Sequence, residues 1–307
     1  MTSINTNVQM EKRKFQLYEH PWLSLLVFII TTVFSILLSG IVIFGIMKLP
    51  ENSPTVQFVQ GMSYHILTIF ILVPFVLHLP KGKRTYRQYL DDIGLSRMQP
   101  FIKLMFLALS CYIILVLSQI AASLVYRLFE GLPITLDFIH RVVNLSGDLP
   151  PGSSSLLISI PSAFEEAAFR GIVLTVFLNK YSEHKSIVFS SLGFGLMHVL
   201  NLLNGADFVW VMGQIVWAFI IGLFYGYVFV RTRSLLPPMI VHYLGNVFIG
   251  SLTGYMQASA SIETQVLYGV TLSLGIVPTA LMILWTKFFT SKWLTTDNHY
   301  EVADPKN

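Results

Sequence analysis

Two adjacent glutamates and an arginine, Glu165, Glu166 and Arg170, lie inside an apolar stretch of residues 156–178. A charged side chain at the centre of a bilayer costs about 2.5–3.5 kcal/mol even on a lenient scale, so ionisable residues in such a stretch indicate a functional site. On a helix, Glu166 and Arg170 share a face, whereas Glu165 points about 100° away. We therefore interpret Glu166 and Arg170 as a supporting ion pair and Glu165 as the reactive carboxylate.

Histidines occur in two further apolar segments. His198 follows Phe194 by four residues and precedes Asn201 by three, and His242 precedes Asn246 by four, so each histidine shares a helix face with its partners. A bilayer offers no water to an imidazole, and these side chains should therefore face the interior of a helix bundle.

Together these segments supply a carboxylate, two imidazoles and a carboxamide, which are the components of a hydrolytic site. Glu165 would deprotonate water, His198 and His242 would position it, and Asn246 would donate to the oxyanion that forms on a carbonyl. Alternatively, Glu165, His198 and His242 would bind one divalent metal such as zinc and leave a position for water. The residue types do not separate these two chemistries.

The elements that position these residues are predicted to be membrane helices. Of the 307 residues, 54% are hydrophobic and only 12% are charged, which is typical of a polytopic membrane protein. The sequence predicts an all-α bundle of about eight transmembrane helices. The candidate spans are residues 21–47, 57–79, 101–126, 154–178, 186–203, 208–230, 235–255 and 265–286.

The spans form one predicted transmembrane domain, residues 21–290, between an N-terminal tail of residues 1–20 and a C-terminal tail of residues 291–307. Lys and Arg are concentrated in alternate loops, which predicts that both tails are cytoplasmic and that the protein lies in the plasma membrane. The net charge of +4 is not gathered in one motif, so we expect no nucleic-acid partner. The single cysteine, Cys111, excludes an intrachain disulfide and is interpreted as a buried inert thiol.

The order Glu-Glu-x-x-x-Arg, Phe-x-x-x-His and His-x-x-x-Asn resembles the CAAX protease and bacteriocin-processing (Abi) family of intramembrane proteases. The resemblance covers residues 153–251. It implies that Glu165 activates water, that Glu166 and Arg170 support the site, and that His198, His242 and Asn246 complete it. It also implies cleavage of membrane-associated peptides or proteins, in CAAX-type processing, peptide maturation or bacteriocin immunity.

Other interpretations remain open. Glu165, His198 and His242 would also suit the proton relay of a transporter, or the protein would be a non-catalytic regulator that binds a partner such as a sensor kinase. A capping box starting at Ser162 would make Glu165 a structural residue.

Several other features have structural interpretations. His65 and His78 are interpreted as residues that hydrogen-bond between helices. Gly222 and Gly226 have the spacing of close helix packing within the chain, or of a homodimer. Residues 81–100 are expected to form a short interfacial helix, and residues 127–152 a lid.

Overall fold

The computed structural model describes residues 17–50, 53–78, 85–129, 131–138, 154–249 and 275–294. These residues form helices and turns without a strand, which confirms the all-α prediction for the described part of the chain. The α-helices are α1 (Pro21–Gly40), α2 (Pro54–His65), α3 (Tyr86–Asp92), α4 (Phe101–Phe129), α6 (Ser154–Ile158), α7 (Ile160–Glu166), α8 (Thr175–Leu178), α9 (Glu183–Met197), α10 (Phe208–Thr232), α11 (Leu236–Leu244) and α14 (Ile276–Phe289).

Shorter 3₁₀ and π-helical segments continue many of these helices. The π-helical segments are η2 (Ile41–Ile46), η3 (Ile66–Leu72), η4 (Pro74–His78), η6 (Ala167–Leu174), η8 (Gly245–Ile249) and η10 (Thr290–Leu294). The 3₁₀ segments are η1 (Leu17–Glu19) and η7 (His198–Asn204).

Five helices of the described chain are long and apolar enough to cross a membrane: Pro21–Ile46, Pro54–Val76, Phe101–Phe129, Glu183–Leu203 and Phe208–Thr232. Each overlaps a predicted span. The predicted span 154–178 is helical but interrupted at Ser159. The spans 235–255 and 265–286 fall partly outside the described residues, as do both tails and most of the expected lid, so the number eight stays a prediction.

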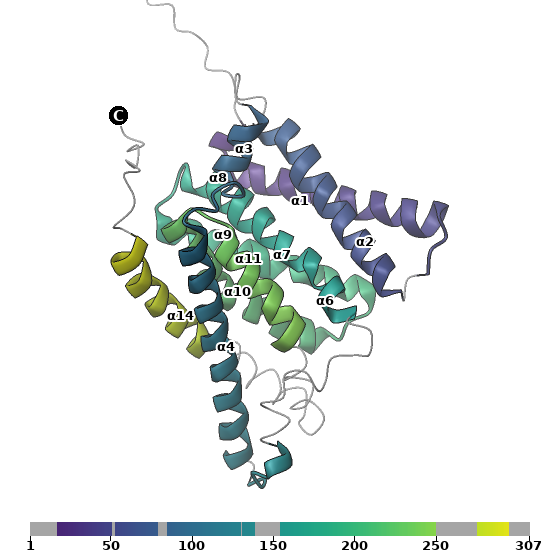
Figure 1. Cartoon of the computed structure of the whole chain (residues 1–307). Coiled ribbons are helices and arrows are strands. Elements are labelled where there is room, and N and C mark those ends of the chain that lie inside the picture. Colours follow the sequence, from purple (N-terminus) through teal and green to yellow (C-terminus); the bar gives the residue numbers. More distant parts are fainter. Residues whose placement is uncertain are drawn as a thin grey trace, which may run out of the picture.

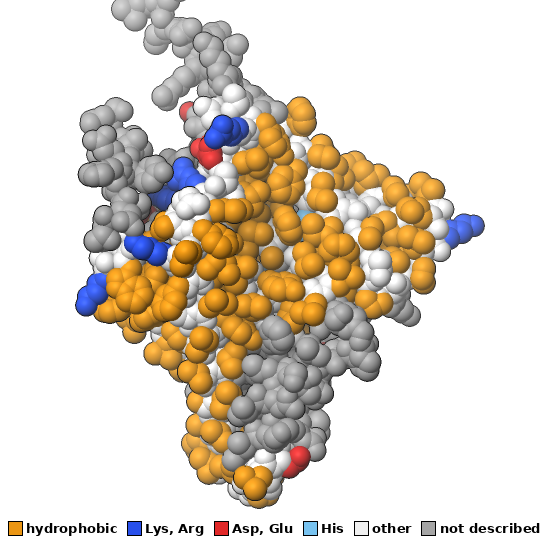
Figure 2. All heavy atoms as spheres, in the orientation of Figure 1, with side chains coloured by type: hydrophobic (Ala, Val, Ile, Leu, Met, Phe, Trp, Pro, Cys, Tyr) orange, Lys and Arg blue, Asp and Glu red, His pale blue; other side chains and the backbone are white. Residues whose placement is uncertain are grey.

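Helices α7, α9, α10 and α11 occupy the middle of the bundle, with α1 and α2 on one side and α4 and α14 on the other (Figure 1). Helix α10 packs against α9 and α14, and α11 packs against α4 and α7. Apolar side chains cover most of the visible face, and the Lys and Arg side chains lie near its edges (Figure 2). This distribution matches a surface that faces lipid.

One buried apolar cluster forms between α4, α10 and α14. Cys111 lies there at 1% exposure, and its sulfur contacts the Thr286 hydroxyl. The predicted buried thiol is therefore confirmed.

Glycines allow α10 to approach α9 closely. A Cβ at Gly222 would lie 3.1 Å from the Ser191 Cβ, and a Cβ at Gly226 would lie 3.0 Å from the Ile187 Cγ2. The predicted intramolecular packing is confirmed at both positions, and dimerisation stays untested.

The loop at residues 85–100 contains the predicted short helix, α3. A reciprocal capping box between Thr85 and Gln88 starts this helix. The Tyr89 hydroxyl donates to the Ile69 carbonyl at 2.6 Å, and the Tyr86 hydroxyl donates to the Phe70 carbonyl at 3.1 Å. Both carbonyls belong to η3, so α3 is anchored to the end of the α2 span.

Candidate active site

The helix that carries the glutamates begins before the position required by the capping-box interpretation. Helix α7 starts at Ile160 with Pro161 in its first turn, and the Ser162 hydroxyl donates to the Ser159 carbonyl at 2.6 Å. Glu165 therefore lies in the last turn of α7 and not at its third position. The capping-box interpretation is wrong for this reason.

Glu166 forms a buried polar cluster with Arg170 and His242. The Arg170 Nη1 lies 3.2 Å from the Glu166 Oε2, and the His242 Nδ1 lies 2.8 Å from the Glu166 Oε1. Glu166 and Arg170 are both 0% exposed, and His242 is 5% exposed. The expected ion pair is thus present, and Glu166 also links α7 to α11.

The Arg170 guanidinium is enclosed by aromatic rings and backbone. It lies 4.3 Å from the centroid of Phe194 and 5.2 Å from that of Tyr225, and its Nη2 donates to the Gly222 carbonyl at 3.2 Å. The Tyr225 ring also stacks on His242 at 5.4 Å between centroids. A buried charge needs such partners, because desolvation of an unpaired guanidinium is very costly.

Both histidines of the predicted site form a hydrogen bond through their Nδ1 atom. The His198 Nδ1 lies 3.1 Å from the Phe194 carbonyl oxygen, which can only accept a hydrogen bond, so Nδ1 carries the proton. The same reasoning assigns the proton to Nδ1 of His242, which faces the Glu166 carboxylate. In the neutral form each Nε2 therefore keeps a lone pair, which is the state that accepts a hydrogen bond from water.

Glu165 and Asn246 lie apart from this cluster. Glu165 is partly buried and Asn246 is exposed, and neither side chain hydrogen-bonds to another described residue. Glu165 is within electrostatic range of Tyr64, Arg170 and Tyr225. Asn246 follows the change from α11 to η8 at Gly245, which separates its environment from that of buried His242.

All predicted site residues except His242, which lies within α11, lie at or beside a departure from α-helical geometry. Glu165 and Glu166 end α7 before η6, His198 begins η7, and Asn246 lies in η8. Departures of the π type frequently occur at functional sites.

Helix α2 contributes residues that the sequence interpretation did not place in the site. His65 is 5% exposed, and its ring centroid lies 4.2 Å from that of Tyr64 and 6.3 Å from that of Phe164. Its Nε2 has no hydrogen-bond partner among the described residues, so the predicted helix-to-helix hydrogen bond is wrong for this atom. The side chain of His78 lies outside the described part of the structure.

The site residues were tested for a metal-binding arrangement. No three His, Cys, Asp or Glu side chains converge as metal ligands within the described ranges. The described residues therefore do not form a preassembled three-ligand metal site, and no step below involves a metal.

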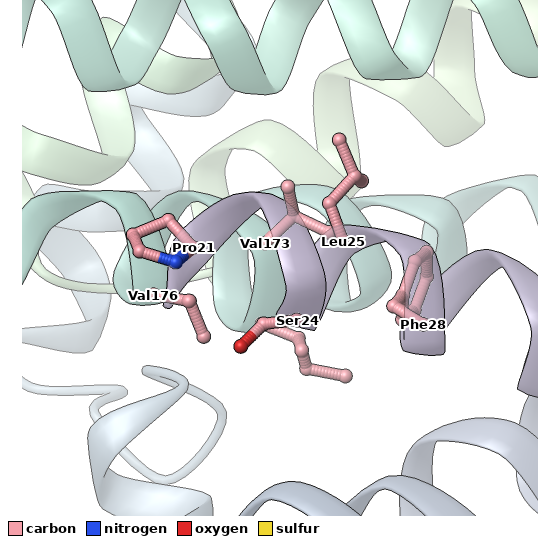
Figure 3. A pocket seen from close by; sticks show the side chains of 7 residues that line it. Pro21, Ser24, Leu25, Phe28, Val173 and Val176 are labelled. Carbon is pink, nitrogen blue, oxygen red and sulfur yellow. The ribbon is translucent and has the colours of Figure 1, made fainter. Parts of the chain in front are cut away.

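A crevice of about 170 Å³ lies elsewhere, between α1 and the segment formed by η6 and α8 (Figure 3). It is lined by Pro21, Ser24, Leu25, Phe28, Ile172, Val173 and Val176. Its polar lining group, the Ser24 hydroxyl, donates to the Leu17 carbonyl at 2.8 Å. This apolar crevice includes none of the predicted site residues.

Comparison with known families identifies the segment that contains the cluster. Residues 152–248 match the family model described as type II CAAX prenyl endopeptidase Rce1-like. The segment is Rce1-like. Comparison with curated proteins and with solved structures gives no further match.

The matched segment agrees with the resemblance that the three motifs indicated. It contains Glu165, Glu166, Arg170, His198, His242 and Asn246, and hence all residues of the predicted site. The description of this family model names an endopeptidase.

Proposed function

We propose that the protein is an intramembrane endopeptidase that hydrolyses peptide bonds of membrane-associated peptides or proteins by a glutamate-activated water. The observation that supports this most strongly is the buried link between Glu166, Arg170 and His242 inside the Rce1-like segment. It holds an imidazole in one orientation within a membrane-spanning bundle.

In the proposed reaction, Glu165 takes a proton from water while the water oxygen attacks the carbonyl carbon. The Nε2 atoms of His198 and His242 position the water, because their Nδ1 atoms are engaged elsewhere. Asn246 donates to the oxyanion. When the carbon–nitrogen bond breaks, Glu165 returns the proton to the leaving amine.

Glu166 and Arg170 act as positioning residues in this scheme. The Glu166 carboxylate fixes the tautomer of His242, and Arg170 compensates the charge of that carboxylate. A hydrogen bond from a carboxylate to Nδ1 commonly fixes which nitrogen of a functional histidine is available.

The substrate class follows from the Rce1-like match. We propose C-terminal peptides bearing a prenylated CAAX sequence as the first candidates, with peptide maturation and bacteriocin immunity as the other roles of the same chemistry. The site residues lie on helices inside the bundle, so a substrate must enter the bundle, and membrane-associated peptides are therefore favoured over soluble ones.

The test is cleavage by purified protein in detergent of a farnesylated CAAX peptide and a pool of short membrane-associated peptides. Glu165→Ala should retain the fold and lose cleavage by a factor of about 10²–10⁴, since a general base contributes about that much. Glu183→Ala, which removes an exposed glutamate at the start of α9, is the matched control. Cleavage by Glu165→Ala at the wild-type rate would remove this mechanism.

A wild-type protein that cleaves nothing would contradict the proposed protease. Proton-coupled uptake into liposomes would then test the transporter interpretation, with the same Glu165→Ala variant as control.

A further inference from the structure

The end of α2 approaches the catalytic helix closely. A Cβ at Gly61 would lie only 2.7 Å from the Pro161 Cγ, so the α2 backbone lies directly against the first turn of α7. His65 lies one turn further along α2, near Phe164, the residue before Glu165. Helix α2 therefore forms a wall beside the proposed reactive carboxylate.

Two buried polar atoms at the end of α2 and in η3, which continues it, have no hydrogen-bond partner among the described residues. They are the Nε2 of His65 and the Oγ1 of Thr68. His65 is 5% exposed and Thr68 is 2% exposed. Because buried polar groups in proteins are almost always hydrogen-bonded, each of these atoms needs a partner that the described residues do not supply.

The surroundings of His65 belong to the site. His65 interacts electrostatically with His242, and the adjacent Tyr64 does so with Glu165. The Tyr64 and His65 rings lie against each other at 4.2 Å between centroids. The pair therefore extends the polar region from α7, α9 and α11 to a fourth helix.

A peptide in a membrane cavity has its own unsatisfied groups. Its scissile segment must be unwound to expose a peptide bond, and each free N–H and C=O then needs a partner inside the cavity. An imidazole nitrogen serves as donor or acceptor according to its tautomer and so can pair with either group.

We propose that His65 is a substrate-binding residue, whose Nε2 hydrogen-bonds to the main chain of the peptide beside the bond that is cleaved. The inference rests on the proposed protease function. It assigns α2 a role in holding the substrate, whereas α7, α9 and α11 carry the chemistry.

The kinetic test compares His65→Phe, which keeps a ring but removes both nitrogens, with His65→Gln, which keeps a terminal amide. We expect His65→Phe to raise KM by about tenfold, the effect of one lost hydrogen bond, with kcat nearly unchanged. His65→Gln should restore most of the affinity. Ser63→Ala is the matched control on α2, because the Ser63 hydroxyl donates to the Val59 carbonyl of its own helix.

A second measurement does not depend on turnover. In protein labelled with ¹⁵N-histidine and carrying Glu165→Ala, addition of a peptide that wild type cleaves should shift the ring-nitrogen signal of His65. The signal is assigned by its loss in His65→Gln.

Failure of the proposed protease function and failure of the proposed role of His65 give different results. Absence of cleavage by wild type contradicts the proposed function. A wild-type KM in a folded His65→Phe, or a His65 signal unmoved by a cleavable peptide, contradicts the role of His65 alone. If His65→Phe does not fold, the ¹⁵N measurement alone tests whether His65 binds the peptide.

Discussion

The Glu166 Oε1 lies 2.8 Å from the His242 Nδ1, and the two residues are separated by 76 positions in the sequence. This contact turns a local ion pair into a link between two helices. It also fixes the orientation of an imidazole in the site through a carboxylate that Arg170 already contacts.

Arg170→Ala should strongly destabilise the protein. Both Glu166 and Arg170 are fully buried, so the variant leaves a carboxylate without its charge partner, which costs about 3–5 kcal/mol. We expect a low yield of monodisperse protein and a lower thermal midpoint in detergent. Arg231→Ala, at the exposed end of α10, should behave like wild type. An Arg170→Ala protein with the wild-type midpoint would refute the supporting role of the pair.

Gly222→Ala should damage the site through the same arginine. The added Cβ would lie 2.8 Å from the Arg170 Nη2 and 3.1 Å from the Ser191 Cβ, so the guanidinium or α9 would have to move. The control is Gly193→Ala on α9, where the nearest atom is 3.7 Å away. There, alanine should stabilise the helix by about 0.5–1 kcal/mol. Equal thermal midpoints for the two variants would contradict the close approach at Gly222.

Tyr89→Phe should destabilise the protein more than Tyr86→Phe. Both hydroxyls donate to adjacent carbonyls of η3, but Tyr89 is fully buried whereas Tyr86 is 42% exposed. Loss of the buried donor leaves the Ile69 carbonyl unsatisfied, at a cost of about 1–3 kcal/mol, whereas water can replace the Tyr86 hydroxyl. Denaturation of both variants under the same conditions measures the difference, and the reverse order would contradict the assignment.

The Tyr89 hydrogen bond should also persist at alkaline pH. Burial raises the pKa of the Tyr89 hydroxyl, and the neighbouring Tyr86 raises it further. In the folded protein this keeps the phenol protonated, so its contribution to stability is fully present below the ordinary tyrosine pKa and is lost progressively as the pH rises above that value, where only the unfolded chain has lost the proton. The stability difference between wild type and Tyr89→Phe should therefore be the same at pH 7 and pH 9 and should fall above about pH 10, and an unchanged or larger difference at pH 11 would contradict it.

Chelation should leave cleavage intact. Within the described residues, the carboxylates and imidazoles are not arranged as three converging metal ligands. Activity of wild-type protein before and after dialysis against a chelator checks this expectation. Loss of activity that zinc restores would instead support binding of a metal by Glu165, His198 and His242.

The spacing of residues along the sequence was sufficient to predict features that depend on a single helix face. The Glu166–Arg170 pair and the packing of Gly222 and Gly226 follow from separations of four residues, because such residues share a helix face. The short helix α3 was likewise predicted from its own segment.

Contacts between distant segments were not predictable in this way. The binding of Glu166 to His242 depends on how α7 and α11 pack, and no sequence spacing defines that register. His65 was assigned to helix packing because a single membrane histidine carries no motif. Its unpartnered Nε2 became evident only once α2 was placed beside α7.

The π-helical segments affect how a mutational scan of this protein should be analysed. A π turn shifts the phase of the residues that follow it, since its hydrogen bonds span five residues instead of four. Across α7, η6 and α8, a single helical period would therefore assign some side chains to the wrong face of the helix. A substitution profile over residues 160–178 should show separate periodicities before and after η6, with the change of phase directly after Glu166.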